Sequence, residues 1–232
     1  MKPAPHSPLA ANQAATPWQA TYTRLFDAYG PQHWWPGETA FEVMVGAVLT
    51  QNTAWRNVER AINRLGAANA LDVAALRALP HAELAELIRP AGYFNVKARR
   101  LHALCDFLIA EAVADAPARL AERAPLPALR AKLLGVHGIG PETADSILLY
   151  ALGLPSFVVD AYTRRIFGRL GLLAGAPSYA DVQATFAREL PHDVALFNEY
   201  HALIVAHGKD VCRVNPRCAI CALAGVCASR AA

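Results

Sequence analysis

Apolar residues recur at intervals of three and four along most of this 232-residue chain, which is the spacing that lines one face of an α-helix. A clear example is the series Phe41, Met44, Val45, Val48 and Leu49. No segment alternates apolar and polar residues as a half-buried strand would. Breaks rich in proline and glycine divide the pattern into roughly nine or ten helices of ordinary length. The sequence therefore predicts an all-α fold.

Composition excludes a membrane-spanning protein and leaves nucleic acid as a possible ligand. Hydrophobic residues make up 54% of the chain, but glycine, proline and serine interrupt the longest apolar run, at 147–159, which is shorter than the ~18 residues of a membrane span. The formal net charge is only +3, so DNA binding would need a local basic face. Residues 1–16 contain no apolar core of signal-peptide type. We expect a disordered tail there, on a monomeric cytoplasmic protein of bacterial, nucleoid-associated type.

The stretch from Leu133 to Ile166 joins a glycine turn, a helix start and a single aspartate. Its Gly-Ile-Gly turn at 138–140 lets the backbone approach another molecule closely. Pro141 suits the first turn of a helix, where its missing N–H costs nothing. The N–H groups at that turn and the positive end of the helix dipole suit a phosphate oxygen. The stretch therefore predicts a site for an anionic backbone, with Asp160 following the next apolar run.

Four cysteines near the end of the sequence form a second signal. Cys212, Cys218, Cys221 and Cys227 have the spacing C-x5-C-x2-C-x5-C. Four thiolates in one short loop can hold a single metal centre, and disulfides are the weaker alternative in a chain without a secretion signal. The spacing leaves tetrahedral zinc and a [4Fe-4S] cluster open. Cys105 stands apart and is expected to be a buried apolar residue.

The hairpin, the aspartate and the cysteine quartet, in this order, resemble the endonuclease III superfamily of helix-hairpin-helix (HhH-GPD) DNA glycosylases. The similarity covers nearly everything after the tail and includes GAVLTQNT at 46–53, RPAGYFNVKARRL at 89–101 and HGKDVC at 207–212. It implies an all-α protein with a DNA-filled cleft between two domains. These are a six-helix domain and a cluster domain built from both chain ends, and the cofactor implied is one [4Fe-4S] cluster. The expected bounds are 33–154 for the six-helix domain, about 128–152 for its hairpin, and 17–32 with 155–232 for the cluster domain.

The resemblance also implies a catalytic role for Asp160. The family aspartate at this position stabilises the cationic sugar as the base leaves and helps to position water. A carboxylate suits this role because an oxocarbenium-like centre needs a nearby negative charge. Asp160 could equally cap the helix that begins at Ala161, and the two roles are compatible.

Glu142 departs from the pattern of the bifunctional family members. Those members carry a lysine at this position, and its amine attacks the sugar to form a Schiff base. A carboxylate cannot form an imine. The resemblance therefore implies base removal by hydrolysis, without AP lyase activity, and Glu142 itself suits the first turn of a helix.

The run WWPGETAFEVMVGAVLTQNT, followed by a further aromatic residue, resembles the 3-methyladenine DNA glycosylase branch. Residues at these positions of that branch stack on the flipped base. An alkylated purine is cationic, and an indole face attracts a cation by about 0.5–2 kcal/mol. Ordinary packing is the alternative role for these aromatic residues. The predicted base pocket consists of Trp34, Trp35, Pro36 and Trp55.

Base flipping leaves a gap in the duplex that the protein must fill. By position, Gln51 and Tyr93 match the gap-filling and wedge residues of the family, and a flat side chain at a turn can intercalate. The other predicted DNA-binding residues are Gly138, Ile139, Gly140, Glu142, Thr143 and Lys209. Further candidates for phosphate contact, unless they are simply solvated, are Lys97, Arg99, Arg100, Arg213 and Arg217.

These features together predict a monofunctional DNA glycosylase of base excision repair. Its expected substrate is double-stranded DNA that contains a damaged base, in the first place an alkylated purine such as 3-methyladenine. One alternative keeps the scaffold but assigns oxidised pyrimidines or mismatched bases, as in endonuclease III. A third hypothesis, from another class, is a DNA-binding damage sensor without catalysis.

Overall fold

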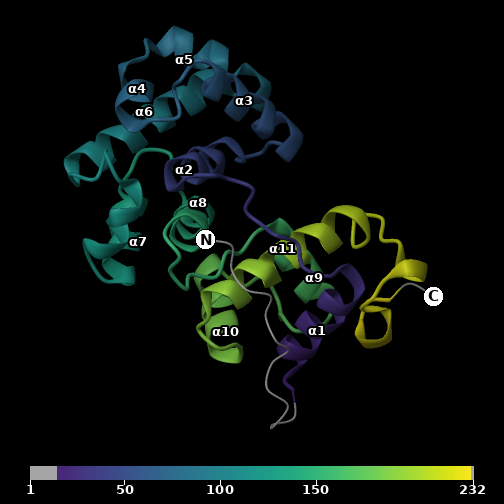
Figure 1. The fold of residues 1–232 in the computed structure, drawn as a ribbon. Helices are drawn as coiled ribbons and strands as arrows, with labels where there is room; N and C mark the ends of the chain where they lie inside the picture. Colours follow the sequence, from purple (N-terminus) through teal and green to yellow (C-terminus); the bar gives the residue numbers. More distant parts are fainter. Residues whose placement is uncertain (1–14, 231–232) are drawn as a thin grey trace. The chain divides into compact units, whose positions relative to one another are not determined.

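The computed structural model describes residues 15–230, which form helices and connecting loops with no strand (Figure 1). The all-α prediction is confirmed. None of the described helices is long and apolar enough to cross a membrane. The chain divides into two compact units, each described below by itself. The central unit runs from Trp35 to Leu154, and the terminal unit combines the chain up to Trp34 with the chain from Pro155 onward.

The central unit is built around one helix that is buried on nearly all sides. This helix, α2 (Ala40–Leu49), has few polar residues and contacts later helices of the unit, including α3, α6 and α8. The remaining helices of the unit can be followed in Figure 1 from blue to teal, and α4 and α5 pack on α6. They are α3 (Trp55–Ala67), α4 (Val73–Ala78), α5 (His81–Leu87), η1 (Arg89–Ala91), α6 (Phe94–Ala110), η2 (Pro117–Glu122), α7 (Leu126–Leu134), α8 (Pro141–Ser146) and the π-helical turn η3 (Ile147–Ala151).

Local sequence signals set several of these helix ends. The Thr39 hydroxyl accepts a hydrogen bond from the backbone N–H of Glu42 and so caps α2. The Asp72 carboxylate accepts two backbone N–H groups at the start of α4. The described residues contain eleven α-helices where nine or ten were expected. Short helices such as α4 and α5 account for the difference, because six or seven residues carry too little periodicity to be counted separately.

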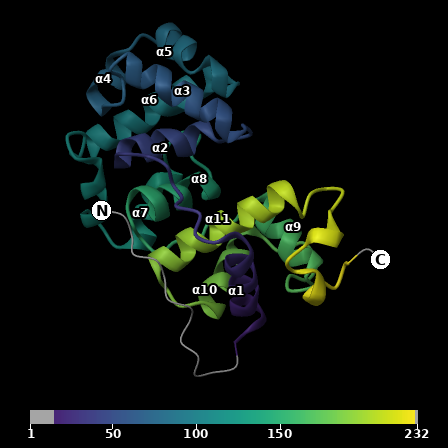
Figure 2. The ribbon, with the colours of Figure 1, turned by 45° about the vertical axis from the view of Figure 1, so that its right-hand side comes forward.

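The terminal unit joins the two ends of the described chain around an aromatic core. Its helices are α1 (Pro17–Tyr29), α9 (Ala161–Arg169), α10 (Tyr179–Glu189) and α11 (Val194–Asp210), followed by the short turns η4 (Cys218–Ile220) and η5 (Ala224–Val226). The Trp18 ring stacks on Phe167 at 4.7 Å and meets Phe186 edge-on. The Tyr200 hydroxyl donates to the backbone oxygen of Trp18 at 2.7 Å. Figure 2 shows α1 beside α10 and α11, which it contacts.

The predicted disordered tail, residues 1–16, lies outside the described residues except for its last two. Thr16 accepts a hydrogen bond from the backbone of Gln19, and the Gln19 side chain accepts one from the backbone of Thr16. This reciprocal capping box satisfies two N–H groups at the start of α1. Thr16 therefore belongs to the helix start and not to a tail.

Candidate active site

Asp160 is the first residue of the candidate site, and it stands directly before α9 in the terminal unit. Its Oδ1 atom accepts hydrogen bonds from the Thr163 backbone N–H at 2.7 Å and from the Thr163 hydroxyl at 2.8 Å. The capping role considered from the sequence is therefore present. It uses one carboxylate oxygen and leaves Oδ2 for another partner.

That partner is His201 of α11, whose Nε2 atom lies 3.6 Å from Asp160 Oδ2. The Asp160 side chain is only 11% exposed. Burial by itself raises the pKa of this carboxyl, but the hydrogen bond and charge of His201 and the two Thr163 donors lower it more, so the net pKa lies below the ordinary value. Asp160 is thus a buried carboxylate that stays ionised at neutral pH.

The predicted hairpin lies in the central unit and consists of α7, a tight turn and α8. Gly138 adopts φ +82°, and a Cβ atom there would also collide with the Arg100 side chain, so glycine is required on both grounds. Pro141 occupies the first turn of α8, as predicted. Gly140 and Glu142 are exposed, whereas the side chains of Ile139 and Thr143 are buried. Any DNA contact from Ile139 or Thr143 must therefore come from the backbone.

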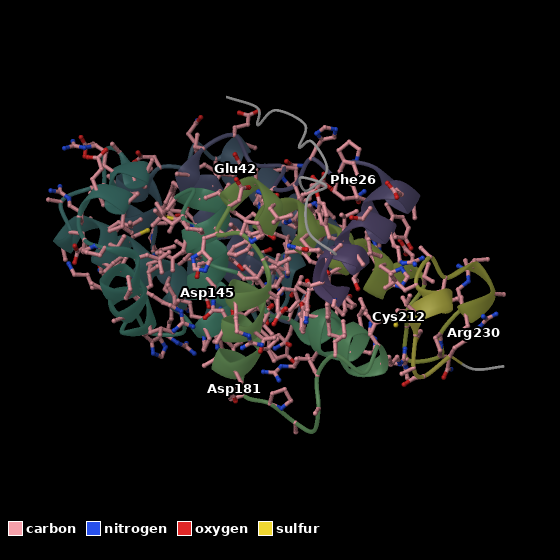
Figure 3. All side chains as sticks on the ribbon, turned by 90° about the horizontal axis from the view of Figure 1, so that it is seen from below. Phe26, Glu42, Asp145, Asp181, Cys212 and Arg230 are labelled. Atoms are coloured by element: carbon pink, nitrogen blue, oxygen red, sulfur yellow. The ribbon has the colours of Figure 1, made fainter. Side chains whose placement is uncertain are left out.

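A buried ion pair fixes the two helices of the hairpin to each other, and the sequence analysis did not identify it. The Arg130 guanidinium of α7 donates to both carboxylate oxygens of Asp145 in α8, at 2.8 and 2.9 Å. The Asp145 side chain is fully buried and Arg130 is 24% exposed. Figure 3 labels Asp145 on its helix. Paired N–H···O bonds of this kind fix orientation as well as distance.

Gln51 contacts the hairpin directly. Its Nε2 atom donates to the Gly138 backbone oxygen at 3.0 Å and to the Thr143 hydroxyl at 2.9 Å. Its Oε1 atom accepts a hydrogen bond from Arg100. The structure therefore brings together three of the predicted DNA-binding residues, Gln51, Gly138 and Thr143. Arg100, which was predicted as a candidate for phosphate contact, donates to Gln51 and so helps to hold its side chain in this group.

Tyr93 and Lys97 are neighbours in sequence but differ completely in exposure. The Tyr93 side chain is 73% exposed at a turn where its own backbone and that of Gly92 are left-handed, with φ of 46° and 67°. Lys97 is 1% exposed, and its ammonium is bonded inside the unit. Burial, and then the charge of Arg100, lower the pKa of Lys97 to about 8. The prediction that Lys97 contacts phosphate is wrong, because the periodicity of α6 places it on the buried face.

Aromatic side chains of the predicted base pocket meet in the central unit. Trp35 packs edge-to-face on Trp55 and tilted against Tyr150, each at 5.2 Å between ring centroids. A Cβ atom at Gly46 would lie 2.9 Å from the Trp35 ring, so this glycine makes room for the indole. Trp35 and Trp55 remain half-buried, and Pro36 is exposed. Trp34 is the last residue of the other unit's first segment.

Lys209 lines a pocket of the terminal unit with a volume of about 450 Å³. Arg165 lies against this pocket and donates to the backbone oxygens of Gly208 and Cys212, which ties α9 to the end of α11. Arg213 also lines the pocket. Two of the predicted phosphate contacts are thus brought together, and they can offer positive charge to one anionic group. Arg99 is exposed on α6 of the central unit, and Arg217 is exposed directly before η4.

The four predicted metal ligands follow α11 on irregular backbone, where Figure 3 labels Cys212. Burial raises the pKa of the Cys221 thiol, a hydrogen bond from the Leu223 backbone N–H opposes this, and the charges of the other three cysteines raise the pKa further. Arg169 of α9 contacts two of the four: its guanidinium donates to Cys212 Sγ at 3.3 Å, and its backbone oxygen accepts from Cys227 Sγ at 3.5 Å. Within the described residues, however, no three His, Cys, Asp or Glu side chains converge as a single metal ion requires. A [4Fe-4S] cube places each thiolate on a separate iron, so its ligands need not meet at one point.

Residues 45–192 match the sequence profile described as "HhH-GPD superfamily base excision DNA repair protein". The chain belongs to this family. A protein of Methanocaldococcus jannaschii, named "Putative DNA repair glycosylase", is 46% identical over 209 residues, which are 90% of this chain and 94% of the relative. Endonuclease III of Sulfolobus acidocaldarius is 28% identical over 191 residues, which are 81% of each chain.

Two solved structures share the fold. The structure of a non-covalent endonuclease III–DNA complex superposes with a TM-score of 0.75 at 24% identity and covers 90% of this chain and 92% of the other. The 3-methyladenine DNA glycosylase of H. pylori bound to 1,N6-ethenoadenine gives a TM-score of 0.70 at 27% identity, with 83% and 95% covered. The predicted superfamily is therefore confirmed. HhH-GPD membership makes this chain a DNA glycosylase of base excision repair.

Proposed function

We propose that the protein is a monofunctional DNA glycosylase that hydrolyses the N-glycosidic bond of a damaged, in the first place alkylated, purine. The observation that carries this proposal is the buried, ionised Asp160 carboxylate, whose Oδ2 atom is not used by the helix cap. Glycosidic cleavage develops positive charge on the sugar. A fixed negative charge in a site with little water stabilises that charge more than water would.

The monofunctional part of the proposal rests on the hairpin. Glu142 is exposed in the first turn of α8, where a bifunctional enzyme of this superfamily would carry its lysine nucleophile. The central unit contains two lysines: Lys97 is buried and bonded by its three donors, and Lys132 of α7 donates to both carboxylate oxygens of Glu111. Glu142 cannot form an imine with the sugar, so water is the proposed nucleophile.

The alkylated substrate is supported by the aromatic cluster and by one relative. Trp35 and Trp55 leave part of their rings accessible, and an electron-rich indole favours a cationic purine. The H. pylori relative is named as a 3-methyladenine DNA glycosylase. The endonuclease III relatives favour a second candidate, removal of oxidised pyrimidines or mismatched bases on the same scaffold.

The test is incubation of the purified protein with duplexes that contain one defined lesion each. We expect release of 3-methyladenine and an abasic strand that breaks only after alkali treatment. Preferential release of an oxidised pyrimidine or a mismatched base would support the second candidate. Borohydride should trap no covalent adduct, because a carboxylate, Glu142, stands where a bifunctional enzyme would carry its lysine. Any trapped adduct would contradict the monofunctional assignment.

We further propose that Cys212, Cys218, Cys221 and Cys227 hold one [4Fe-4S] cluster with a structural role. Four cysteine ligands leave no open position for a substrate. The contacts of Cys212 and Cys227 with the same residue, Arg169, support this proposal. We expect the purified protein to show the visible absorbance of iron-bound thiolates, and Cys221→Ser to lose this absorbance together with stability. Stoichiometric zinc in a colourless protein would overturn the assignment, and Cys105→Ser, which changes a cysteine buried in the other unit, is the matched control.

A further inference from the structure

We propose that Lys97 is a positioning residue that joins two segments of the central unit into one rigid insert for DNA. The first segment is the loop of residues 50–54, which carries Gln51, and the second is the turn of residues 89–93, which carries Tyr93. The inference deepens the proposed function, since these segments are the ones expected to enter the duplex when a base is flipped.

The ammonium group of Lys97 is fully used by these two segments. It donates to the Leu49 backbone oxygen at 2.9 Å, to the Thr53 hydroxyl at 2.7 Å and to the Ala91 backbone oxygen at 2.8 Å. A lysine ammonium has three donors, and each one is used here. Leu49 directly precedes the first segment and Thr53 lies within it. Ala91 lies in the second segment, two residues before Tyr93.

Thr53 completes the link between the segments. Its hydroxyl accepts from Lys97 and donates to the same Ala91 oxygen, at 2.5 Å. Lys97, Thr53 and Ala91 therefore form a closed triangle of hydrogen bonds. Such a triangle restrains both segments at once, because movement of either one would break at least one bond in a buried place.

Both segments contain strained backbone that needs this restraint. Asn52 adopts φ 52° in the first segment and Tyr93 adopts φ 46° in the second, a region that residues with a Cβ rarely occupy. Conformations of this kind persist only where the surrounding structure over-determines them. Tyr93 is exposed, so packing does not set the direction of its ring; the turn does.

Core stability alone does not explain a lysine at this position. An apolar side chain of similar length would fill the same space without the cost of burying a charge. What the ammonium adds is geometry, since it directs three hydrogen bonds at two segments far apart in sequence. The geometry therefore indicates that Lys97 fixes the position of the two segments relative to each other. The loss of Lys97 should affect the extrusion of a paired base more than the chemical step.

The test compares Lys97→Met with Leu104→Ala, a matched control that opens a cavity on the same helix and removes none of these hydrogen bonds. Hydrogen–deuterium exchange should become faster at residues 50–53 and 91–93 in Lys97→Met and not in Leu104→Ala. Base release should fall at least tenfold more on a fully paired duplex than on a duplex whose target base faces an abasic-site analogue. Extrusion of an unopposed base costs less. Leu104→Ala should affect both duplexes equally.

Equal losses on the two duplexes in Lys97→Met, or unchanged exchange in both segments, would overturn the inference. If the wild-type protein releases no base from either duplex, the proposed function fails, and the exchange measurement alone then decides whether Lys97 joins the segments. Thr53→Val, with Thr53→Ser as its control, serves if Lys97→Met does not fold. Thr53→Val removes the shared hydroxyl and should reproduce the faster exchange, and Thr53→Ser should not.

Discussion

Replacement of Asp160 by asparagine is expected to reduce base release by about 10²–10³-fold, the usual cost of removing a single electrostatic group from an active site. The change removes the negative charge that the proposed mechanism places beside the developing cation, and it keeps the shape of the side chain. Single-turnover release of the base from a lesion-containing duplex is the measurement. Release at the wild-type rate would remove Asp160 from the mechanism and favour a DNA-binding sensor.

The same variant separates the two roles of this residue. Asparagine is as good a helix cap as aspartate, so its amide oxygen can still accept from the Thr163 backbone and hydroxyl. At neutral pH, Asp160→Asn should lose the contact with His201 and keep the helix cap. Apart from the cost of the lost contact, its free energy of unfolding should differ from that of the wild type by no more than about 1 kcal/mol. Asp160→Ala loses the cap as well and should cost a further ~0.5–2 kcal/mol.

The pH dependence of stability follows from the lowered pKa of Asp160. A carboxyl whose pKa is lower in the folded state than in the unfolded state stabilises the fold above its unfolded pKa. That contribution is lost as the pH falls through the folded-state value. The free energies of unfolding of the wild type and of Asp160→Asn should therefore become equal only under strongly acidic conditions. Denaturant unfolding of both proteins across the acidic pH range is the measurement.

Arg130→Met is expected to destabilise the protein by about 3–5 kcal/mol, because it removes the bidentate partner of a fully buried carboxylate. The loss should appear in denaturant unfolding and as weaker binding of undamaged DNA, since the ion pair holds α7 against α8. Arg77→Met is the control. The side chains of its ion pair with Asp106 are 44% and 57% exposed, so its loss should leave the stability nearly unchanged. Equal effects of the two variants would contradict the special role of the buried pair.

The sequence predicted those parts of the fold and site that depend on local patterns. The three- and four-residue periodicity identified the helices, and the Gly-Ile-Gly-Pro order located the turn before α8. The position of Asp160 directly before Ala161 predicted a helix cap, which the structure confirms, whereas its catalytic role came from the family resemblance and stays a prediction. Each of these signals lies within a few residues, where backbone preference and side-chain chemistry act directly.

The supporting contacts could not be predicted because they join distant positions. His201 lies in α11 and reaches Asp160 only after α9 and α11 have packed together. Lys97 looked like a basic surface residue, since the sequence did not show which face of α6 is buried. Arg130 and Asp145 each look like ordinary charged residues of a helix, and only the hairpin geometry pairs them. A signal for Lys97 existed in hindsight, because it stands one turn before the apolar Leu101 on the same helix face.

The aromatic contact between α1 and the later helices has a consequence for synthesis on the ribosome. Trp18 leaves the exit tunnel long before Phe167 and Phe186, which it needs for burial, have been made. The central unit is continuous and can fold in the interval, which lasts on the order of ten seconds at about 5–20 residues per second. Until then the apolar face of α1 lacks its final partners and stays open to non-native contacts on the nascent chain.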